Sequence, residues 1–235
     1  MKHTYIFLLT LLTFSLFINS CKKQAPACTG NCETINANGN VLNKLTNASA
    51  AGVPVSLSWV KFVGGFSQSE VIATINSKSD GTFNFTSNID TTYFSRGYFL
   101  SLSVGSNNEY IILGYSGVIK IRTYSFDQNA FQRVQLEVYK KANLKIKLHR
   151  TQTDNFQNFS IAHSNVVNDF FLYDYNVQSP QEVIDINKSE IDISTVADVF
   201  TKIRVIKTLT DGTVNITIDS VKCPANTTSS YDVNF

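Results

Sequence analysis

The chain has 235 residues, a formal net charge of +2 and 16% charged residues. A chain this close to neutral has no electrostatic footprint for nucleic acid, so we expect no nucleic-acid partner. Aromatic residues make up 12% of the chain, strand-forming residues recur, and helix-period patterns are scarce, which together predict an all-β fold.

Residues 1–20 have the features of a secretory signal peptide. A mildly basic start, MKH, precedes residues 4–18, which carry no charge. A transmembrane helix needs about 20 apolar residues, so this run is short for a membrane span and fits the apolar core of a signal peptide. Its end, INSC at residues 18–21, resembles the lipobox of bacterial lipoproteins.

The lipobox resemblance implies a lipid anchor on Cys21. In such lipoproteins the cysteine sulfur receives a diacylglyceryl group, the chain is cleaved before the cysteine, and the new amino terminus is acylated. Two or more acyl chains anchor a protein stably, whereas one does so only marginally. We therefore expect an exported protein of the cell envelope, held by the acylated Cys21 in the outer membrane of a Gram-negative bacterium, on either side of it. The alternative is a plain signal peptide with an accidental cysteine.

Residues 21–33, CKKQAPACTGNCE, are predicted to form a tether, because their Pro, Gly and polar residues argue against regular structure. With Cys21 lipidated, the disulfide candidates are Cys28, Cys32 and Cys223, and one of them must stay free or pair with another molecule. We favour a local Cys28–Cys32 bridge, and a long-range bridge from either of them to Cys223 is the alternative. A C-x-x-x-C pair can also bind metal, but no His lies near it and zinc requires four ligands, so we predict no metal site.

Strand patterns fill residues 34–140. Alternation over residues 53–63 puts Val53, Val55, Leu57 and Trp59 on one face, and further strand-like runs follow at residues 70–76, 98–104 and 133–139. The Asp80–Gly81 pair lies between two such runs and predicts a β-hairpin with positive φ at both central positions.

Part of this region resembles a known domain family. The stretch NGNVLNKLTNASAAGVPVSLSWVKF, followed by ATINSKSDGTFNF, is similar to carboxypeptidase regulatory-like domains, which have a transthyretin-like β-sandwich. The resemblance implies this fold over residues 34–140 and brings no active site with it, since such domains are grafted onto many proteins. The residues that match the family pattern are Gly39, Val41, Gly52, Pro54, Val55, Thr74, Asp80, Gly81, Phe83, Phe85, Gly97 and Tyr98.

Residues 141–235 are predicted to form a second antiparallel β-sandwich in tandem with the first. Asp211–Gly212 marks another hairpin turn, and residues 178–190 are the expected long loop. Strand-like runs recur at residues 143–150, 156–163, 170–176, 199–209 and 213–221. Alternation predicts that Leu144, Ile146 and Leu148 face inward, and that Val214, Ile216 and Ile218 share one face.

No catalytic constellation is visible in the sequence. Only His149 and His163 follow the signal peptide, and neither lies in a G-x-S-x-G context. We therefore predict no catalytic residue, no cofactor and no turnover; a hydrolase, the less favoured alternative, would need a deep pocket that holds one of these histidines beside an acid and a nucleophile. A possible calcium set does not match the EF-hand spacing, so we predict no calcium site there: Asp185, Asn187, Glu190 and Asp192.

Charge is segregated along the second half of the chain. Residues 140–150 are rich in Lys and Arg, and residues 169–198 are mostly acidic where they are charged. One interpretation is a basic face toward anionic lipid or lipopolysaccharide, with an acidic face toward cations. We favour the other, a solvated strand edge whose lysines prevent edge-to-edge pairing.

The run FFLYDY places Phe171, Tyr173 and Tyr175 on one strand face, and we name these residues as binding candidates. A flat row of aromatic side chains can stack on sugar rings or pack against a neighbouring domain, and exposed aromatic patches usually mark contact sites. The predicted function is a non-enzymatic binding, adhesion or scaffolding module of the envelope, with an envelope protein or a glycan as partner. The alternative is a glycan-capturing module of a nutrient-uptake system.

Overall fold

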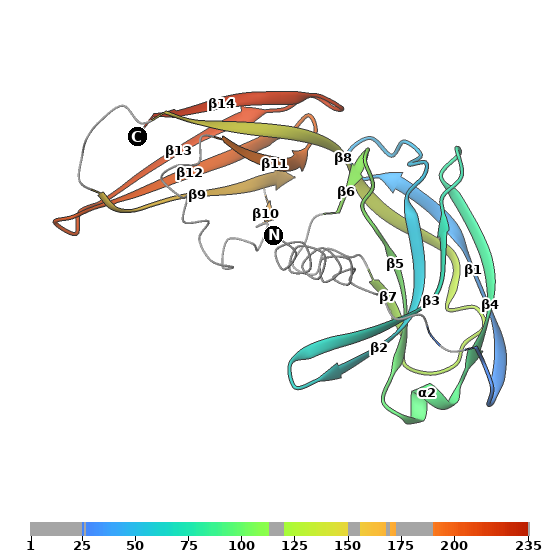
Figure 1. Ribbon diagram of the computed structural model, residues 1–235. Helices are drawn as coiled ribbons and strands as arrows, with labels where there is room; N and C mark the ends of the chain where they lie inside the picture. The colour runs from blue at the N-terminus through green and yellow to red at the C-terminus, as the bar shows by residue number, and fades with distance from the viewer. Residues whose placement is uncertain are drawn as a thin grey trace, which may run out of the picture.

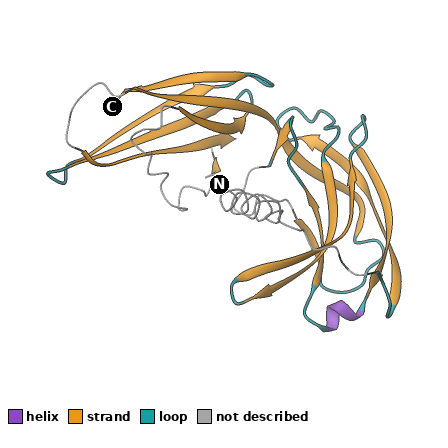
Figure 2. Ribbon diagram, in the orientation of Figure 1, coloured by secondary structure: helices purple, strands orange, loops and turns teal. Residues whose placement is uncertain are grey.

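The fold is taken from a computed structural model, which describes residue 25 and residues 27–112, 120–149, 156–167, 170–172 and 190–234. Within these ranges the chain is almost entirely β-strand, with one helical turn, α2 (Thr92–Ser95), so the predicted all-β fold is confirmed (Figure 2). The described residues include no helix of the length and apolarity needed to cross a membrane. Cys21 and the apolar run at residues 4–18 lie outside them.

Two sheets face each other in the first sandwich (Figure 1). One sheet has the order β3-β2-β5-β7 and consists of β3 (Phe66–Asn76), β2 (Pro54–Val63), β5 (Phe99–Val104) and β7 (Lys120–Thr123). The facing sheet contains β4 (Thr82–Asp90), β1 (Cys32–Asn43), the first part of β8 (Phe131–His149) and the short β6 (Tyr110–Ile111). Val55, Leu57 and Trp59 are buried between the two sheets, as their alternation predicts.

The second sandwich also has two sheets. One has the order β10-β9-β12-β13 and consists of β10 (Phe170–Leu172), β9 (Phe156–Val167), β12 (Phe200–Leu209) and β13 (Val214–Lys222). The second part of β8 faces it together with β11 (Glu190–Val196) and β14 (Thr228–Asn234). Leu144, Ile146 and Leu148 are buried in this second core, so their predicted inward direction is confirmed.

Strand β8, which is 19 residues long, belongs to both sandwiches. Its first part pairs in parallel with β1, from Ala37 opposite Phe131 to Asn43 opposite Val138. Its second part lies between β11 and β14. Buried residues of β8 pack in the first core up to Val138 and in the second core from Ala142 onward. The backbone therefore passes from one core to the other inside a single strand.

The Asp80–Gly81 turn forms, but the strands that it joins do not pair with each other. Gly81 has a φ of +77°, as predicted, and its N–H donates to the carbonyl oxygen of Lys78, whereas Asp80 does not have positive φ. β3 pairs with β2 and β4 pairs with β1, so the turn leads from one sheet to the other. The predicted hairpin is therefore wrong here: a turn signal specifies the local backbone path, while the long ladder offered by β1 decides where β4 lies.

The Asp211–Gly212 turn does close a true hairpin. β12 and β13 pair antiparallel on either side of it, from Phe200 opposite Lys222 to Thr208 opposite Val214, which confirms this second prediction. As in the first turn, the glycine has positive φ, at +86° for Gly212, and the aspartate does not.

Gly39 is required by a bulge between β1 and β8. The register of the two strands shifts between Ala37 and Gly39, and Arg133 on the β8 side has a φ of +56°. A Cβ atom on Gly39 would lie 1.8 Å from the backbone oxygen of Val134, a distance that no side chain can occupy. The glycine that opens the family-like pattern thus has a steric function at the place where the two strands meet.

Candidate binding surfaces

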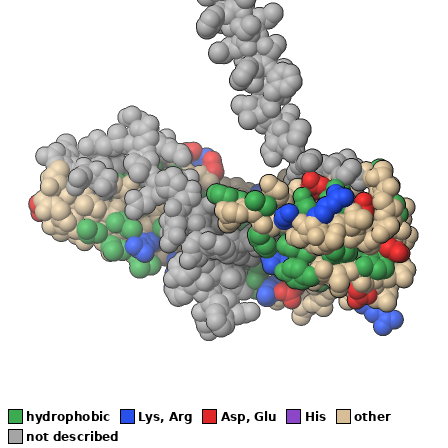
Figure 3. Space-filling model, turned by 90° about the horizontal axis from the view of Figure 1, so that it is seen from below, with side chains coloured by type: hydrophobic (Ala, Val, Ile, Leu, Met, Phe, Trp, Pro, Cys, Tyr) green, Lys and Arg blue, Asp and Glu red, His purple; other side chains and the backbone are tan. Residues whose placement is uncertain are grey.

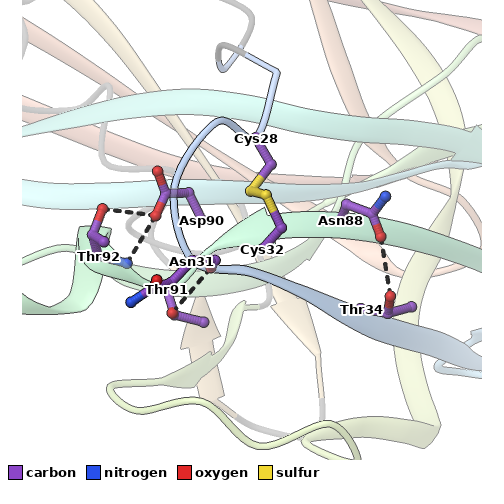
Figure 4. The surroundings of a disulfide bond; sticks show 8 residues. All are labelled: Cys28, Asn31, Cys32, Thr34, Asn88, Asp90, Thr91 and Thr92. Carbon is purple, nitrogen blue, oxygen red and sulfur yellow. Dashed lines mark hydrogen bonds between the residues drawn. A yellow bond between two sulfur atoms is a disulfide. The ribbon is translucent and has the colours of Figure 1, made fainter.

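The chain enters the first sandwich through a disulfide-bonded loop (Figure 4). Cys28 and Cys32 are joined by a disulfide with their Cα atoms 5.8 Å apart, and Cys32 begins β1 opposite Asp90, the last residue of β4. In the structure the bridge is therefore the local one. Cys223 is a free, buried cysteine in the core of the second sandwich, and this burial raises the pKa of its thiol.

Hydrogen bonds hold this loop against the end of β4. The carbonyl oxygen of Asn31 accepts hydrogen bonds from the Thr91 N–H at 3.0 Å and from its hydroxyl at 3.1 Å. The Asp90 carboxylate accepts from the Thr92 hydroxyl at 2.7 Å and the Thr92 N–H at 3.0 Å, and these two bonds lower the pKa of Asp90. Asp90 is therefore held in the charged form that fixes the chain at this end.

A cavity of about 400 Å³ lies beneath the loop. Trp59 and Ile72 line it from one sheet, and Asp90, Tyr93 and Arg96 line it near the end of β4. Neither His149 nor His163 contributes to this lining, so the cavity does not have the histidine-centred form that the hydrolase interpretation requires. Among the described residues, no group of three His, Cys, Asp or Glu side chains is placed to hold a metal ion.

The two histidines lie in the second sandwich. The Nε2 atom of His149 is 2.6 Å from the Asp232 carboxylate, and both side chains are about half exposed, at 51% and 58%. His163 lies on β9 opposite Ile203 of β12. The His149–Asp232 pair is thus a surface contact between β8 and β14, open to water.

Part of the charge that is segregated in the sequence is paired in the fold. Antiparallel pairing of β11 with β8 places Glu190 opposite Lys147 and Asp192 opposite Lys145. The Nζ atom of Lys145 lies 2.6 Å from the Glu190 carboxylate and 3.9 Å from that of Asp192, and its hydrogen bond lowers the pKa of Glu190. Two of the four calcium candidates are thus near a lysine, and the other two lie outside the described residues.

The favoured interpretation of these lysines as guards of a strand edge is wrong. β8 has β11 on one side and β14 on the other, so it is an inner strand where Lys145 and Lys147 lie. Pairing between strands far apart in the sequence, which alternation does not reveal, accounts for the difference.

An exposed aromatic surface occupies the end of the first sandwich where β2 turns into β3. Phe62 and Phe66 are 58% and 79% exposed on either side of the Gly64–Gly65 turn, and Tyr124, just after β7, is 67% exposed. The ring of Phe99 lies between those of Phe62 and Tyr124, with centroid distances of 5.6 and 5.1 Å. We call Phe62, Val63, Phe66, Tyr124 and Phe126, all exposed, the hairpin patch.

Alternation along residues 53–63 does not indicate the hairpin patch. It predicts a single strand and its buried face, to which Trp59 belongs and Phe62 does not. The signal that could have revealed the patch is local: two consecutive glycines flanked by Phe62, Val63 and Phe66 form a turn in which apolar residues replace the usual polar ones.

A second exposed apolar surface lies on β13, the edge strand of its sheet. Val214, Ile216 and Ile218 share one face, as predicted, and are 53%, 53% and 63% exposed. Asp219, on the opposite face, accepts a hydrogen bond of 2.6 Å from the hydroxyl of Tyr231 on β14, so that face is the one directed at the other sheet. The three aliphatic side chains, which we call the β13 row, therefore point outward.

The aromatic binding candidates lie at the other edge of the same sheet or beyond the described chain. Phe171 is in β10, where it pairs with Val166 of β9. Tyr173 and Tyr175 lie outside the described residues, as does the lipidation candidate Cys21. The binding assignment of these three aromatic residues stays a prediction.

Comparison with known proteins gives little beyond the fold. No family model matches the chain, and no curated protein matches it. Among solved structures, it is similar to the shaft pilin SpaA of Lactobacillus rhamnosus GG, with 11% identity and a TM-score of 0.34, covering 86% of this chain and 97% of that one. It is also similar to a minor pilin of Streptococcus agalactiae, with 9% identity, a TM-score of 0.30 and coverages of 85% and 94%. At these TM-scores the likenesses carry no argument about function.

Proposed function

We propose that the chain is an exported lipoprotein, anchored through Cys21, whose two β-sandwiches form a non-enzymatic binding module of the cell envelope. Its first sandwich would be a carboxypeptidase regulatory-like domain that serves as a spacer. Its second sandwich would carry the contact with an envelope partner, in adhesion or in the scaffolding of an assembly.

The observation that carries this proposal is the direction of β1 and β8. The tether enters at Cys32, the first residue of β1, and β1 runs parallel to β8, which continues into the second sandwich. The Cys32 end of β1 and the second sandwich are therefore at opposite ends of the first sandwich (Figure 1). At about 3.3 Å per residue, the part of β8 in the first sandwich, from Phe131 to Val138, spans roughly 25 Å, so a lipid on Cys21 would hold the second sandwich away from the bilayer by at least the length of this segment.

The β13 row supplies a surface for a protein partner. In the described part of the chain, β13 pairs only with β12, which leaves the hydrogen-bonding groups of its other edge open. An edge strand of this length with an exposed aliphatic row is a template for a strand added by another chain. We therefore favour an envelope protein that pairs with β13 through its backbone and covers Ile216 and Ile218.

The family assignment is supported by what the motif residues do in the fold. Gly39 lies against the backbone of Val134, Gly81 has positive φ in the turn, and Phe83 is 1% exposed in the first core. These are positions of turn and core, which fits a domain type that is a scaffold rather than a site.

Two other functions remain as alternatives. Glycan capture would use the row formed by Phe171, Tyr173 and Tyr175 and predicts that Tyr173→Ala loses retention on a glycan column without unfolding. A hydrolase would lose turnover on His149→Ala or His163→Ala, and any such loss would overturn the non-enzymatic proposal.

The anchor is tested by Cys21→Ser. In a Gram-negative host fed with labelled palmitate, the parent chain should carry the label and partition into the detergent phase. The Cys21→Ser variant should carry no label and be released or left unprocessed. If the variant is labelled and partitions as the parent does, the lipoprotein proposal is wrong.

The partner surface is tested by Ile218→Asp, with Lys222→Asp at the end of the same strand as its matched control. The exposed Ile218 contributes little to folding, so Ile218→Asp should leave the unfolding transition within about 0.5 kcal/mol of the parent. It should reduce the amount of envelope protein that crosslinks to the intact chain, while Lys222→Asp changes this less. Equal crosslinking of parent and Ile218→Asp would contradict the role of the β13 row.

A further inference from the structure

The hairpin patch is on the same end of the molecule as the tether. β2 runs toward this end and turns into β3 at Gly64–Gly65, while β1 begins there at Cys32. α2 and the Tyr124–Phe126 segment lie at this end as well, because Asp90 is opposite Cys32 and Thr123 is opposite Leu100, next to Phe99 at the start of β5. Every exposed aromatic side chain of the hairpin patch is thus at the end from which the lipid would extend.

The hairpin patch has an apolar tip and a rigid base. Phe62, Val63 and Phe66 are exposed around the Gly64–Gly65 turn. The turn itself stands clear of the rest of the protein, because a Cβ atom built on either glycine would have no neighbouring atom within 4 Å. Behind the tip, Phe99 is 3% exposed, and its ring packs against those of Phe62 and Tyr124 with the ring planes tilted by 32° and 38°. An aromatic tip on a strand pair that is fixed to a core can enter an interface without losing much conformational freedom.

Two basic side chains, Arg122 and Lys61, lie at the patch. The Arg122 guanidinium lies over the rings of Phe62 and Phe99, at 5.9 and 5.4 Å from their centroids. Lys61 precedes Phe62 and donates a hydrogen bond of 2.8 Å to the carbonyl oxygen of Arg96. Figure 3 shows this end, with hydrophobic and basic side chains next to one another and acidic ones interspersed. The acidic side chains of this end include Glu33, Glu70, Asp90 and Asp127, and Lys22 and Lys23 directly follow Cys21 in the sequence.

The length of the tether limits how far a lipid on Cys21 can lie from the hairpin patch. The Ala25 N–H donates a hydrogen bond of 2.7 Å to the carbonyl oxygen of Val71, which fixes Ala25 beside β3. Val71 is five residues along β3 from Phe66, or about 17 Å at 3.3 Å per residue. The four residues from Cys21 to Ala25 span at most about 14 Å. A fully extended tether would therefore end about 3 Å short of the level of Phe66, a distance that the lipid on Cys21 can cover.

We infer that the hairpin patch contacts the lipid bilayer that holds Cys21, with its aromatic and aliphatic side chains at the membrane interface and Lys61, Arg96 and Arg122 near anionic headgroups. Aromatic rings favour this interfacial position, and basic residues near an anionic surface add to it. The inference rests on the proposed lipid anchor. A lipid on a flexible tether lets a domain tumble, whereas a second contact would fix the first sandwich so that β8 points away from the membrane.

The test uses the full, lipidated chain reconstituted into vesicles of phosphatidylglycerol and phosphatidylcholine brominated on its acyl chains. Bromine quenches only tryptophans that it touches, and the single tryptophan of the parent, Trp59, is 2% exposed in the first core. Phe66→Trp places a reporter at the tip, and Ile218→Trp places one at a position of comparable exposure on the second sandwich.

We expect bromine to halve the emission of the tryptophan introduced by Phe66→Trp, since interfacial side chains lie about 5–10 Å into the headgroup and acyl boundary. The Ile218→Trp reporter should be unaffected, and the quenching of Phe66→Trp should weaken when neutral lipid replaces phosphatidylglycerol. If the parent carries its lipid and floats with the vesicles, but the Phe66→Trp reporter is quenched no more than the Ile218→Trp reporter, the hairpin inference is wrong while the anchor stands. If the parent carries no lipid, the anchor proposal fails and the hairpin inference fails with it.

Discussion

Replacing Gly81 by alanine tests the turn that connects the two sheets of the first sandwich. Gly81 has a φ of +77°, and a Cβ atom there would lie 2.7 Å from the carbonyl oxygen of Val41 and 3.0 Å from Cβ of Ser49. Val41 is fully buried in β1, so its backbone oxygen moves only if the strand moves. A left-handed residue with a side chain costs about 1–2 kcal/mol, and overpacking adds about 1–3 kcal/mol. We expect Gly81→Ala to lower the free energy of unfolding by about 3 kcal/mol.

Gly64→Ala is the matched control in the same sandwich. Gly64 has a φ of +57°, but no atom lies within 4 Å of a Cβ built on it. This variant therefore carries the conformational cost without the overpacking, and the reduced freedom of its unfolded chain offsets part of that cost. We expect it to lower the free energy of unfolding by about 1 kcal/mol or less.

The assay is urea unfolding followed by the fluorescence of Trp59, which reports on the first core alone because it is the only tryptophan. With an m-value of about 2 kcal/mol per molar urea, the midpoint should fall by roughly 1.5 M for Gly81→Ala and by roughly 0.5 M or less for Gly64→Ala. Equal midpoints for the two variants would refute the contribution of the Val41 contact.

Three further predictions follow from the same structure. Cys28→Ser should lower the free energy of unfolding by about 2 kcal/mol, because the bridge to Cys32 closes a short loop in the unfolded chain, and an unchanged urea midpoint would contradict this. The pKa values of Asp80 and Asp90 are lowered in the folded protein, so their charged forms stabilise the fold above the usual pKa of 3.8, and this stabilisation is lost as the pH falls through the lower folded pKa values. The urea midpoint should therefore decline below about pH 4. A urea midpoint that does not change with pH in this range would contradict the prediction. Cys223, fully buried and with a raised pKa, should react with a thiol reagent at neutral pH only after unfolding, and rapid labelling of the folded protein by mass spectrometry would disprove its burial.

Alternation along the strands predicted much of the two cores. Val55 and Leu57 in the first sandwich, and Leu144 and Ile146 in the second, are buried as their spacing indicates, because successive strand residues point to opposite faces of a sheet. The two Asp-Gly turns were also predictable as turns, since the glycine has positive φ in both. What these signals share is that each is decided within a few neighbouring residues.

Strand pairing could not be predicted, because it depends on residues far apart in the sequence. β1 lies between β4 and β8, so Ala37 faces Phe85 on one side and Phe131 on the other. Pairing with distant strands also places Lys145 beside Glu190 and makes β8 an inner strand there, in place of the predicted strand edge. Strand β8 pairs with β1 in the first sandwich and with β11 and β14 in the second, and the sequence of β8 does not indicate where one pairing gives way to the other.

The β13 row shows that alternation along a strand predicts which residues share a face, but not which of the two faces is buried. Alternation correctly places Val214, Ile216 and Ile218 on one face, but a face is buried only when a second sheet lies over it. In this sandwich the facing sheet lies on the side of Asp219, whose carboxylate accepts a hydrogen bond from the hydroxyl of Tyr231. Burial of Tyr231, together with this hydrogen bond, raises the pKa of the tyrosine to about 12. The face of β13 that carries Asp219 is thus directed at the facing sheet, and the aliphatic face is exposed to solvent. Their exposure within the described part of the chain is the observation on which the proposed partner surface rests.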